Sequence, residues 1–133
     1  MAEDIVVKEQ LTNEMIEVGA QLIAQLDAVG LPMVAAFWLF SSETNEWRLL
    51  IASPERSVHG PQGIYRKIRE AREALGEKAA ALPLSLVSLI AENDELVQAF
   101  RAIPAGEGIS RKRFTKEVVN RRYIDDALVY RIA

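Results

Sequence analysis

Two apolar runs separated by a short polar stretch constrain the fold of this chain more than any other feature. The first run covers residues 33–40 and the second covers residues 47–53, and the six residues between them are mostly residues that favour turns. Apolar runs of this length, bounded by turn residues, are typical of two β-strands joined in an antiparallel hairpin. If the loop closes symmetrically, Phe40 faces Trp47 across the two strands.

This hairpin is apolar on both of its faces. Side chains alternate between the faces of a strand, so Trp38 faces Leu49 on one side and the residues Phe37, Leu39 and Leu50 lie on the other. Strands of this kind are typical of the interior of a sheet that is covered on both sides. We therefore expect helices or a second copy of the chain to cover each face.

A helix is predicted over residues 13–28. Thr12 or Asn13 can cap its first turn, and Gly30 followed by Pro32 ends it. Its apolar side chains recur at the helical spacing, at Met15, Val18, Leu22 and Leu26.

A second helix is predicted after a loop over residues 57–63. Pro61 is suited to the first turn of that helix, and Gly76 is suited to its end. The apolar run at 84–90 then predicts a third strand, and because only Ser85 and Ser88 are polar, we expect it in the interior of the sheet.

A short third helix is expected after this strand. Asn93 can cap it, and the carboxylates of Asp94 and Glu95 in its first turn are favoured by the helix dipole. Its buried side would consist of Leu96, Phe100 and Ile103.

The C-terminal region alternates between apolar and polar residues over 122–132, which predicts a strand. The segment before it, 109–119, is compatible with a second strand or with a short helix. Its β-branched residues and a turn near Asn120 and Arg121 favour a hairpin.

The summed order of elements is α-β-β-α-β-α-β-β. It predicts a single α+β domain over residues 1–133, with a mixed or antiparallel sheet and helices packed on it. A chain of 133 residues can bury enough surface to fold without a disulfide or a metal ion.

Composition excludes several classes of site. The chain has no cysteine and one histidine, so thiolate metal sites, cysteine nucleophiles and any site with two imidazoles from one chain are ruled out. We expect no metal and no cofactor, and the cytoplasm is the natural location for such a chain. No uncharged stretch reaches the ~18 residues that span a bilayer, and the N-terminus is acidic where a secretory signal is basic, so we expect no membrane or targeting segment.

The loop before the second helix gathers the most polar groups. Ser57, His59 and the backbone amides near Gly60 and Gly63 would lie at a helix N-terminus, which favours anions. His59 could bind phosphate or transfer a proton. A plain turn from strand to helix needs the same Gly60-Pro61 sequence, however, so a structural role is the simpler interpretation.

Charge is divided unevenly along the chain. Residues 1–59 contain three Lys or Arg against nine Asp or Glu, a net charge of −6, and residues 101–133 contain eight against four, a net charge of +4. The basic hairpin could bind nucleic acid or an acidic protein, or its charges could protect an exposed edge strand from aggregation. Its candidate residues are Arg111, Lys112, Arg113, Lys116, Arg121 and Arg122.

Asp126 is an acid on the apolar side of the last strand, which also carries Leu128. It could be a buried acid that pairs with an arginine, or half of an acidic site completed elsewhere, and the first is favoured because buried charges need partners. The adjacent Asp125 points to the opposite face and cannot share an ion with it.

These features predict a small interaction or adaptor protein without enzymatic activity. We expect it to form a homodimer through the apolar sheet or an edge strand. The alternative is a nucleic-acid-binding accessory protein that uses the basic hairpin. An enzyme built around His59 ranks last, because no nucleophile, metal cluster or Gly-rich cofactor loop accompanies that residue.

Overall fold

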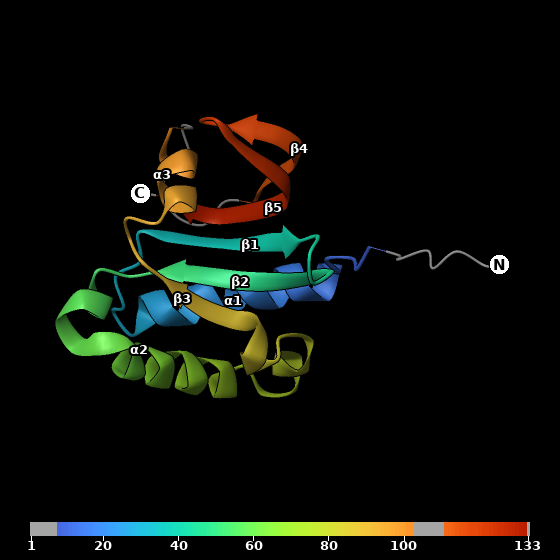
Figure 1. Ribbon diagram of the computed structural model, residues 1–133. Coiled ribbons are helices and arrows are strands. Elements are labelled where there is room, and N and C mark those ends of the chain that lie inside the picture. Colours follow the sequence, from blue (N-terminus) through green and yellow to red (C-terminus); the bar gives the residue numbers. More distant parts are fainter. Residues whose placement is uncertain (1–7, 103–110, 133) are drawn as a thin grey trace.

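The computed structural model describes residues 8–102 and 111–132, which form a mixed five-stranded sheet with helices packed on it (Figure 1). The order of strands is β3-β2-β1-β5-β4; β2 and β3 are parallel, and the other neighbours are antiparallel. This confirms the predicted α+β class and order of elements. The elements are α1 (Asn13–Ala28), β1 (Ala35–Ser41), β2 (Glu46–Ala52), α2 (Glu55–Ala74), the 3-10 helices η1 (Gly76–Ala81) and η2 (Leu84–Leu86), β3 (Val87–Ile90), α3 (Glu95–Arg101), β4 (Lys112–Val119) and β5 (Arg122–Ile132).

The β1–β2 hairpin has the register that the sequence predicts. Phe40 pairs with Trp47 and Trp38 pairs with Leu49. Both strands have a neighbour on each side, so they are interior strands as expected. The alternation of side chains therefore sends one apolar set to each face of the sheet.

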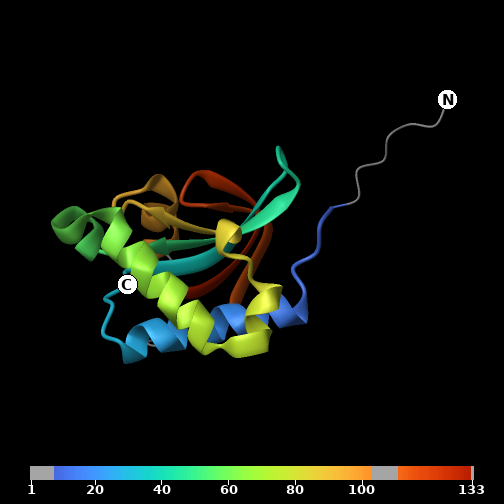
Figure 2. The same cartoon turned by 90° about the horizontal axis from the view of Figure 1, so that it is seen from below.

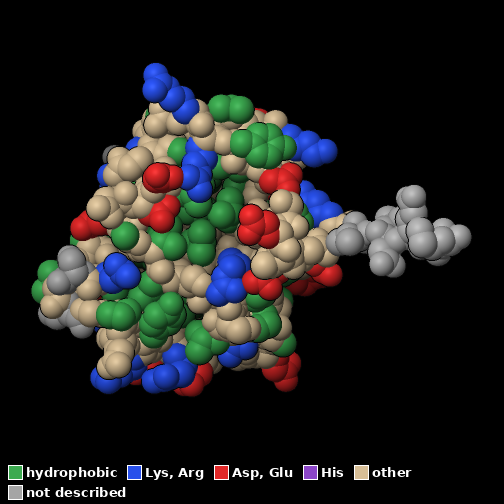
Figure 3. All heavy atoms as spheres, in the orientation of Figure 1, with side chains coloured by type: hydrophobic (Ala, Val, Ile, Leu, Met, Phe, Trp, Pro, Cys, Tyr) green, Lys and Arg blue, Asp and Glu red, His purple; other side chains and the backbone are tan. Residues whose placement is uncertain are grey.

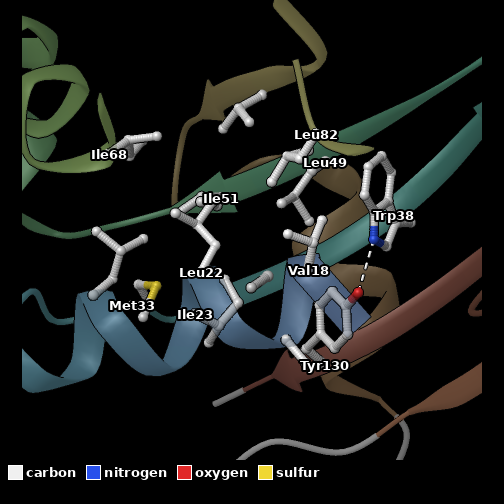
Figure 4. Close-up of a cluster of buried hydrophobic side chains, with 14 of the residues drawn as sticks. Val18, Leu22, Ile23, Met33, Trp38, Leu49, Ile51, Ile68, Leu82 and Tyr130 are labelled. Atoms are coloured by element: carbon white, nitrogen blue, oxygen red, sulfur yellow. Dashed lines mark hydrogen bonds between the residues drawn. The ribbon is translucent and has the colours of Figure 1, made fainter. Parts of the chain in front are cut away.

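The helices α1 and α2 lie side by side on the first face of the sheet (Figure 2). The Thr12 hydroxyl caps α1 by accepting from the Met15 N–H at 3.1 Å, and Gly30 follows its C-terminus with φ of 79°. The buried cluster between these helices and the sheet includes a polar pair, because Trp38 Nε1 donates to the Tyr130 hydroxyl at 2.8 Å (Figure 4). That hydroxyl in turn donates to the Ile16 carbonyl at 2.7 Å, so no polar group of the pair is left unsatisfied.

The second face is covered by the short helix α3 and by the curl of the β4–β5 hairpin (Figure 1). Phe100 of α3 contacts Phe37 and Phe114, with ring centroids 5.0 and 5.3 Å apart. A helix of seven residues covers only part of the face, so several apolar side chains are only half buried. These are Val34, Leu39, Ile90, Leu96 and Ile132.

The predicted cap of this helix is wrong by one residue. Asp94, not Asn93, is the N-cap, because its backbone is extended (φ −57°, ψ 145°) and its carboxylate accepts from the Leu96 N–H at 2.9 Å. The buried side consists of Val97, Ala99 and Phe100, with Leu96 partly buried. The predicted Ile103 lies outside the described residues.

The third strand was expected to be interior, and this prediction is wrong. Residues 84–86 form η2 after Pro83, and the strand proper starts at Val87 and lies at the edge of the sheet, paired only with β2. Its apolar composition reflects packing of its side chains on both faces and not burial of both edges. On the outer side, the Leu89 N–H donates to the Tyr65 hydroxyl at 3.2 Å, so part of this edge is covered by α2.

Residues 112–132 form the β-hairpin that the sequence favours. Midway along its strands, however, the side chains that point to one face of the sheet begin to point to the other. Asn120 and Arg121 have φ of 46° and 69°, as in a two-residue type I′ turn. Strict alternation along β5 would put Ile124 and Leu128 on the same face, whereas Ile124 is buried in the second-face cluster and Leu128 in the first. The change coincides with Lys116 on β4, whose φ of 50° interrupts the regular strand geometry.

Candidate functional site

The predicted anion site does not form as a loop. α2 begins at Glu55, and the helical segments on the two sides of Gly60 are separated only by that residue, with φ of 75° and ψ of 171°. A residue before proline avoids the helical region, and glycine adopts positive φ at little cost, so Gly60 breaks the helix and Pro61 starts its second part. Gly63 then lies within that second part. The side chains of Ser57 and His59 lie outside the described part of the structure, so their proposed role stays a prediction.

A small pocket lies near the start of α2, at the carboxyl ends of the parallel strands β2 and β3. It has a volume of about 260 Å³ and is lined by Ser53, Arg56, Ala91, Glu92 and Asn93. Carboxyl ends of parallel strands are common ligand sites in open sheets. The charges of Arg56 and Glu92 have opposite sign, so the pocket does not favour an anion. Sequence reasoning did not find this pocket, although the order strand, helix, strand is the signal for such a unit.

The basic residues of the C-terminal hairpin do not form one exposed surface. Arg111 pairs with Glu17 of α1 at 2.5 Å, which draws it to the first face. Arg122 pairs with Glu95 of α3 on the second face. The hydrogen bond and charge of Arg111 also lower the pKa of Glu17. These two arginines are thus held on opposite faces of the sheet.

The other four basic residues have different surroundings. Arg113 is paired with Asp126, and the Lys112 ammonium lies over the Phe114 ring, 5.6 Å from its centroid. Within residues 8–102 and 111–132, Lys116 and Arg121 form no ion pair. Because β4 is an edge strand, these exposed cations are placed where they protect the edge from pairing with other chains.

Asp126 is the centre of a polar cluster that joins it to three other side chains. Its carboxylate is only 3% exposed and is held by Arg113 through two bonds, from Nε to Oδ1 at 2.6 Å and from Nη2 to Oδ2 at 2.8 Å. The Thr115 hydroxyl donates to Oδ1 at 3.1 Å, and the Lys8 ammonium donates to Oδ2 at 2.7 Å. The interpretation of Asp126 as a buried acid satisfied by an arginine agrees with these bonds.

Acid will weaken the fold through this carboxylate. Burial raises the pKa of Asp126, but the hydrogen bonds and charges of Arg113 and Lys8 outweigh burial and bring it to about 2, below its usual value of 3.8. Since the folded-state pKa is the lower one, the cluster stabilises fully above pH 3.8, and this stability is lost as the pH falls through about 2. We expect the difference in unfolding free energy between wild type and Asp126→Asn to shrink by about 2 kcal/mol from neutral pH to about pH 2. A difference that is the same at both pH values would contradict this.

Lys8 brings a segment from far along the chain to this cluster. Its ammonium lies over two aromatic rings, 4.7 Å from the centroid of Phe40 and 5.8 Å from that of Trp47. The next residue is anchored through its backbone, because Trp47 Nε1 donates to the Glu9 carbonyl at 2.9 Å and the Glu9 N–H donates to Asn45 Oδ1 at 3.0 Å. We call Asp126, Phe40, Trp47 and Asn45 the Lys8 site.

Sequence reasoning singled out Asp126, placed Phe40 and Trp47 side by side, and missed Asn45 and the lysine that the site holds. Asp126 stood out as an acid among apolar residues, and the register of the β1–β2 hairpin placed Phe40 beside Trp47. Nothing local links Lys8 to Asp126, since 118 positions separate them.

The Lys8 site is suited to holding cations and poorly suited to proton transfer. Asp126 is ionised at neutral pH because of its low pKa, and Arg113, Thr115 and Lys8 occupy both of its oxygens. A general acid or base needs a pKa near the working pH, which this carboxylate lacks. A space of about 360 Å³, lined in part by Lys8, Trp47, Arg113 and Asp126, opens beside it to solvent.

None of the helices in the described residues, 8–102 and 111–132, has the length and the apolar character that a membrane span requires. Comparison of the chain with protein-family models, curated proteins and solved structures gave no match.

Proposed function

We propose that this chain is a non-enzymatic interaction module and that the end of the β4–β5 hairpin is its contact surface. The observation that carries the proposal is the pair Val118 and Tyr123, which are direct cross-strand partners and are 69% and 61% exposed. Hydrophobic side chains reach the surface at this end of the hairpin (Figure 3). Tyrosine is enriched where proteins meet, because its ring buries a large area and its hydroxyl bonds at the rim.

The geometry of the hairpin explains why this pair faces outward. On the other side of the two strands, Val119 and Ile124 are buried in the second-face cluster, and Arg122 pairs with α3. Side chains alternate across a strand, so Val118 and Tyr123 are directed away from α3. Among residues 8–102 and 111–132, no packing requires apolar residues at these two positions.

We propose a second copy of the chain as the partner. Pairing of two β4 edges would bring Lys112, Arg113 and Lys116 near the same three basic residues of the second copy, and like charges oppose such contacts. An apolar pair is complementary to itself across a two-fold axis. The contact would therefore use the hairpin end and not the strand edge. Since it is small, we expect a weak dimer that dissociates on dilution.

Light scattering with chromatography tests this proposal. At tens of micromolar protein, we expect a dimer mass for wild type and a monomer mass for the variant with Val118→Ser and Tyr123→Ser. Val29→Ser is the matched control, because Val29 is 57% exposed at the end of α1, far from β4 in sequence, and this variant should remain dimeric. A monomer mass for wild type at these concentrations would reject self-association.

Nucleic-acid binding is the alternative and has less support. Arg111, Arg113 and Arg122 are each engaged with a carboxylate, so a phosphate-binding surface would depend on Lys112, Lys116 and Arg121. No observation favours catalysis at His59. A chain without cysteine is suited to a reducing compartment, and we include a cytoplasmic location in the proposal.

A further inference from the structure

The Lys8 ammonium is surrounded by a carboxylate and two aromatic rings. The Lys8 Nζ atom lies 2.7 Å from a buried carboxylate oxygen of Asp126 and over the rings of Phe40 and Trp47. A carboxylate bonds strongly to an ammonium, and the electron-rich faces of aromatic rings attract cations. The Lys8 side chain is 42% exposed, so the ammonium position can be reached from solvent.

The site also holds the residue that follows the lysine. The Glu9 N–H donates to Asn45 Oδ1, and the Glu9 carbonyl accepts from Trp47 Nε1. Both bonds use backbone groups of Glu9. Any residue other than proline could make both contacts. We propose that the Lys8 site binds an irregular peptide at a lysine and the residue after it, and that residues 8 and 9 of the chain fill this site in cis.

Exchange of one lysine for another is electrostatically neutral. With Lys8 in place, the cluster has one negative charge on Asp126 and two positive charges, on Lys8 and Arg113. An incoming lysine that replaces Lys8 leaves the net charge of the cluster unchanged, whereas a lysine that binds in addition to Lys8 would make the cluster more positive. The chain's own segment therefore competes directly with the peptide, and its tether gives it a high effective concentration.

The cis segment is held loosely enough to be displaced. The Lys8 side chain is 42% exposed, and when it leaves, Arg113 and Thr115 still donate three hydrogen bonds to the Asp126 carboxylate. Within the described residues, the two backbone bonds of Glu9 are the only other hydrogen bonds between residues 8–9 and the sheet. The space beside Asp126 gives an incoming side chain room to enter. This proposal does not depend on the hairpin contact, since Val118 and Tyr123 take no part in it.

Removing Lys8 will open the site to a peptide added in solution. In the full chain with Lys8→Ala, we expect saturable binding of acetyl-Lys-Glu-Gln-Leu-amide, measured by calorimetry and by tryptophan fluorescence, to which Trp47 at the site contributes. Wild type should bind the peptide at least about tenfold more weakly, because its own lysine occupies the site. A peptide with norleucine in place of lysine has the same length without the charge and should not bind.

Two further variants separate the parts of the site. In the Lys8→Ala chain, Asp126→Asn should abolish binding of both the peptide and n-butylammonium. With Glu9→Pro added to that chain, so that the cis segment has no N–H for Asn45, Asn45→Ala should weaken the peptide about fivefold and leave n-butylammonium unchanged, because only the peptide then has a backbone N–H that donates to Asn45 Oδ1.

Melting curves establish that each variant is folded. Lys8→Met, which keeps an unbranched side chain without the charge, replaces Lys8→Ala if that chain does not fold. Equal binding of the norleucine peptide, or no saturable binding of the lysine peptide to the folded Lys8 variant at millimolar concentration, would overturn the proposal.

Discussion

Replacing Arg113 with methionine will destabilise the protein by about 3 kcal/mol. Methionine fills a similar volume beside Trp47, but it removes the two hydrogen bonds that hold the Asp126 carboxylate. That carboxylate is only 3% exposed, so the loss leaves a buried charge with Lys8 as its single cationic partner. Urea unfolding followed by circular dichroism measures the effect.

Arg122→Met is the matched control for this experiment. It removes an arginine from the same hairpin whose partner, Glu95, is 82% exposed. Pairs exposed to this degree contribute at most about 1 kcal/mol, so the control should lie close to wild type. Equal losses in the two variants would show that burial of Asp126 is not what makes Arg113 important.

Gly19→Ala, which adds one methyl group, will lower the free energy of unfolding by about 3 kcal/mol. Overpacking and the loss of a buried hydrogen bond destabilise the protein by more than the gain in helix propensity stabilises it. The new carbon would overlap the hydroxyl oxygen of Tyr130 and lie 2.9 Å from Trp38 Nε1. Both aromatic side chains are fully buried, so neither can move aside into solvent. Displacing the Tyr130 hydroxyl leaves the Trp38 N–H without its acceptor.

Two comparisons make the Gly19→Ala experiment specific. Gly63→Ala adds the same methyl group to α2, where nothing beyond the adjoining backbone of the helix lies within 4 Å of it, and should stabilise the protein by up to about 1 kcal/mol. Tyr130→Phe removes the oxygen that the new methyl group overlaps, so the double variant with Gly19→Ala should lose less stability than the sum of the two single variants. Thermal unfolding gives all four values. Wild-type stability in Gly19→Ala would contradict the close packing of α1 on β5.

The parts of the fold that the sequence predicts are those governed by neighbours in the chain. The register of Phe40 with Trp47 follows from the length of one loop, and the ends of α1 follow from Thr12 and Gly30. Caps that compete over one position are harder to predict. Asn93 and Asp94 are both good capping residues, and the backbone geometry decides in favour of Asp94.

The parts that the sequence does not predict depend on distant contacts or on unusual backbone angles. The apolar composition of residues 87–90 is compatible with an interior or an edge strand, and the strand order alone decides that β3 is an edge. The change of faces in the C-terminal hairpin arises at Lys116, which adopts positive φ although lysine has no preference for it. The Lys8 site belongs to the same class, since its acid was identifiable and its lysine was not.

The position of β5 in the sheet has a consequence for synthesis of the protein. β5 is made after every other described element, yet it lies between β1 and β4, and Leu39 pairs with Ala127, which is 88 positions further along the chain. At a translation rate of about 5–20 residues per second, β1 therefore waits roughly 4–18 s on the ribosome for its second neighbour. During this interval a strand that is apolar on both faces has an open edge, which is a template for pairing with other nascent chains. The sheet is complete only when β5 has emerged, so chaperones that shield apolar edges would have their greatest effect on yield before that point.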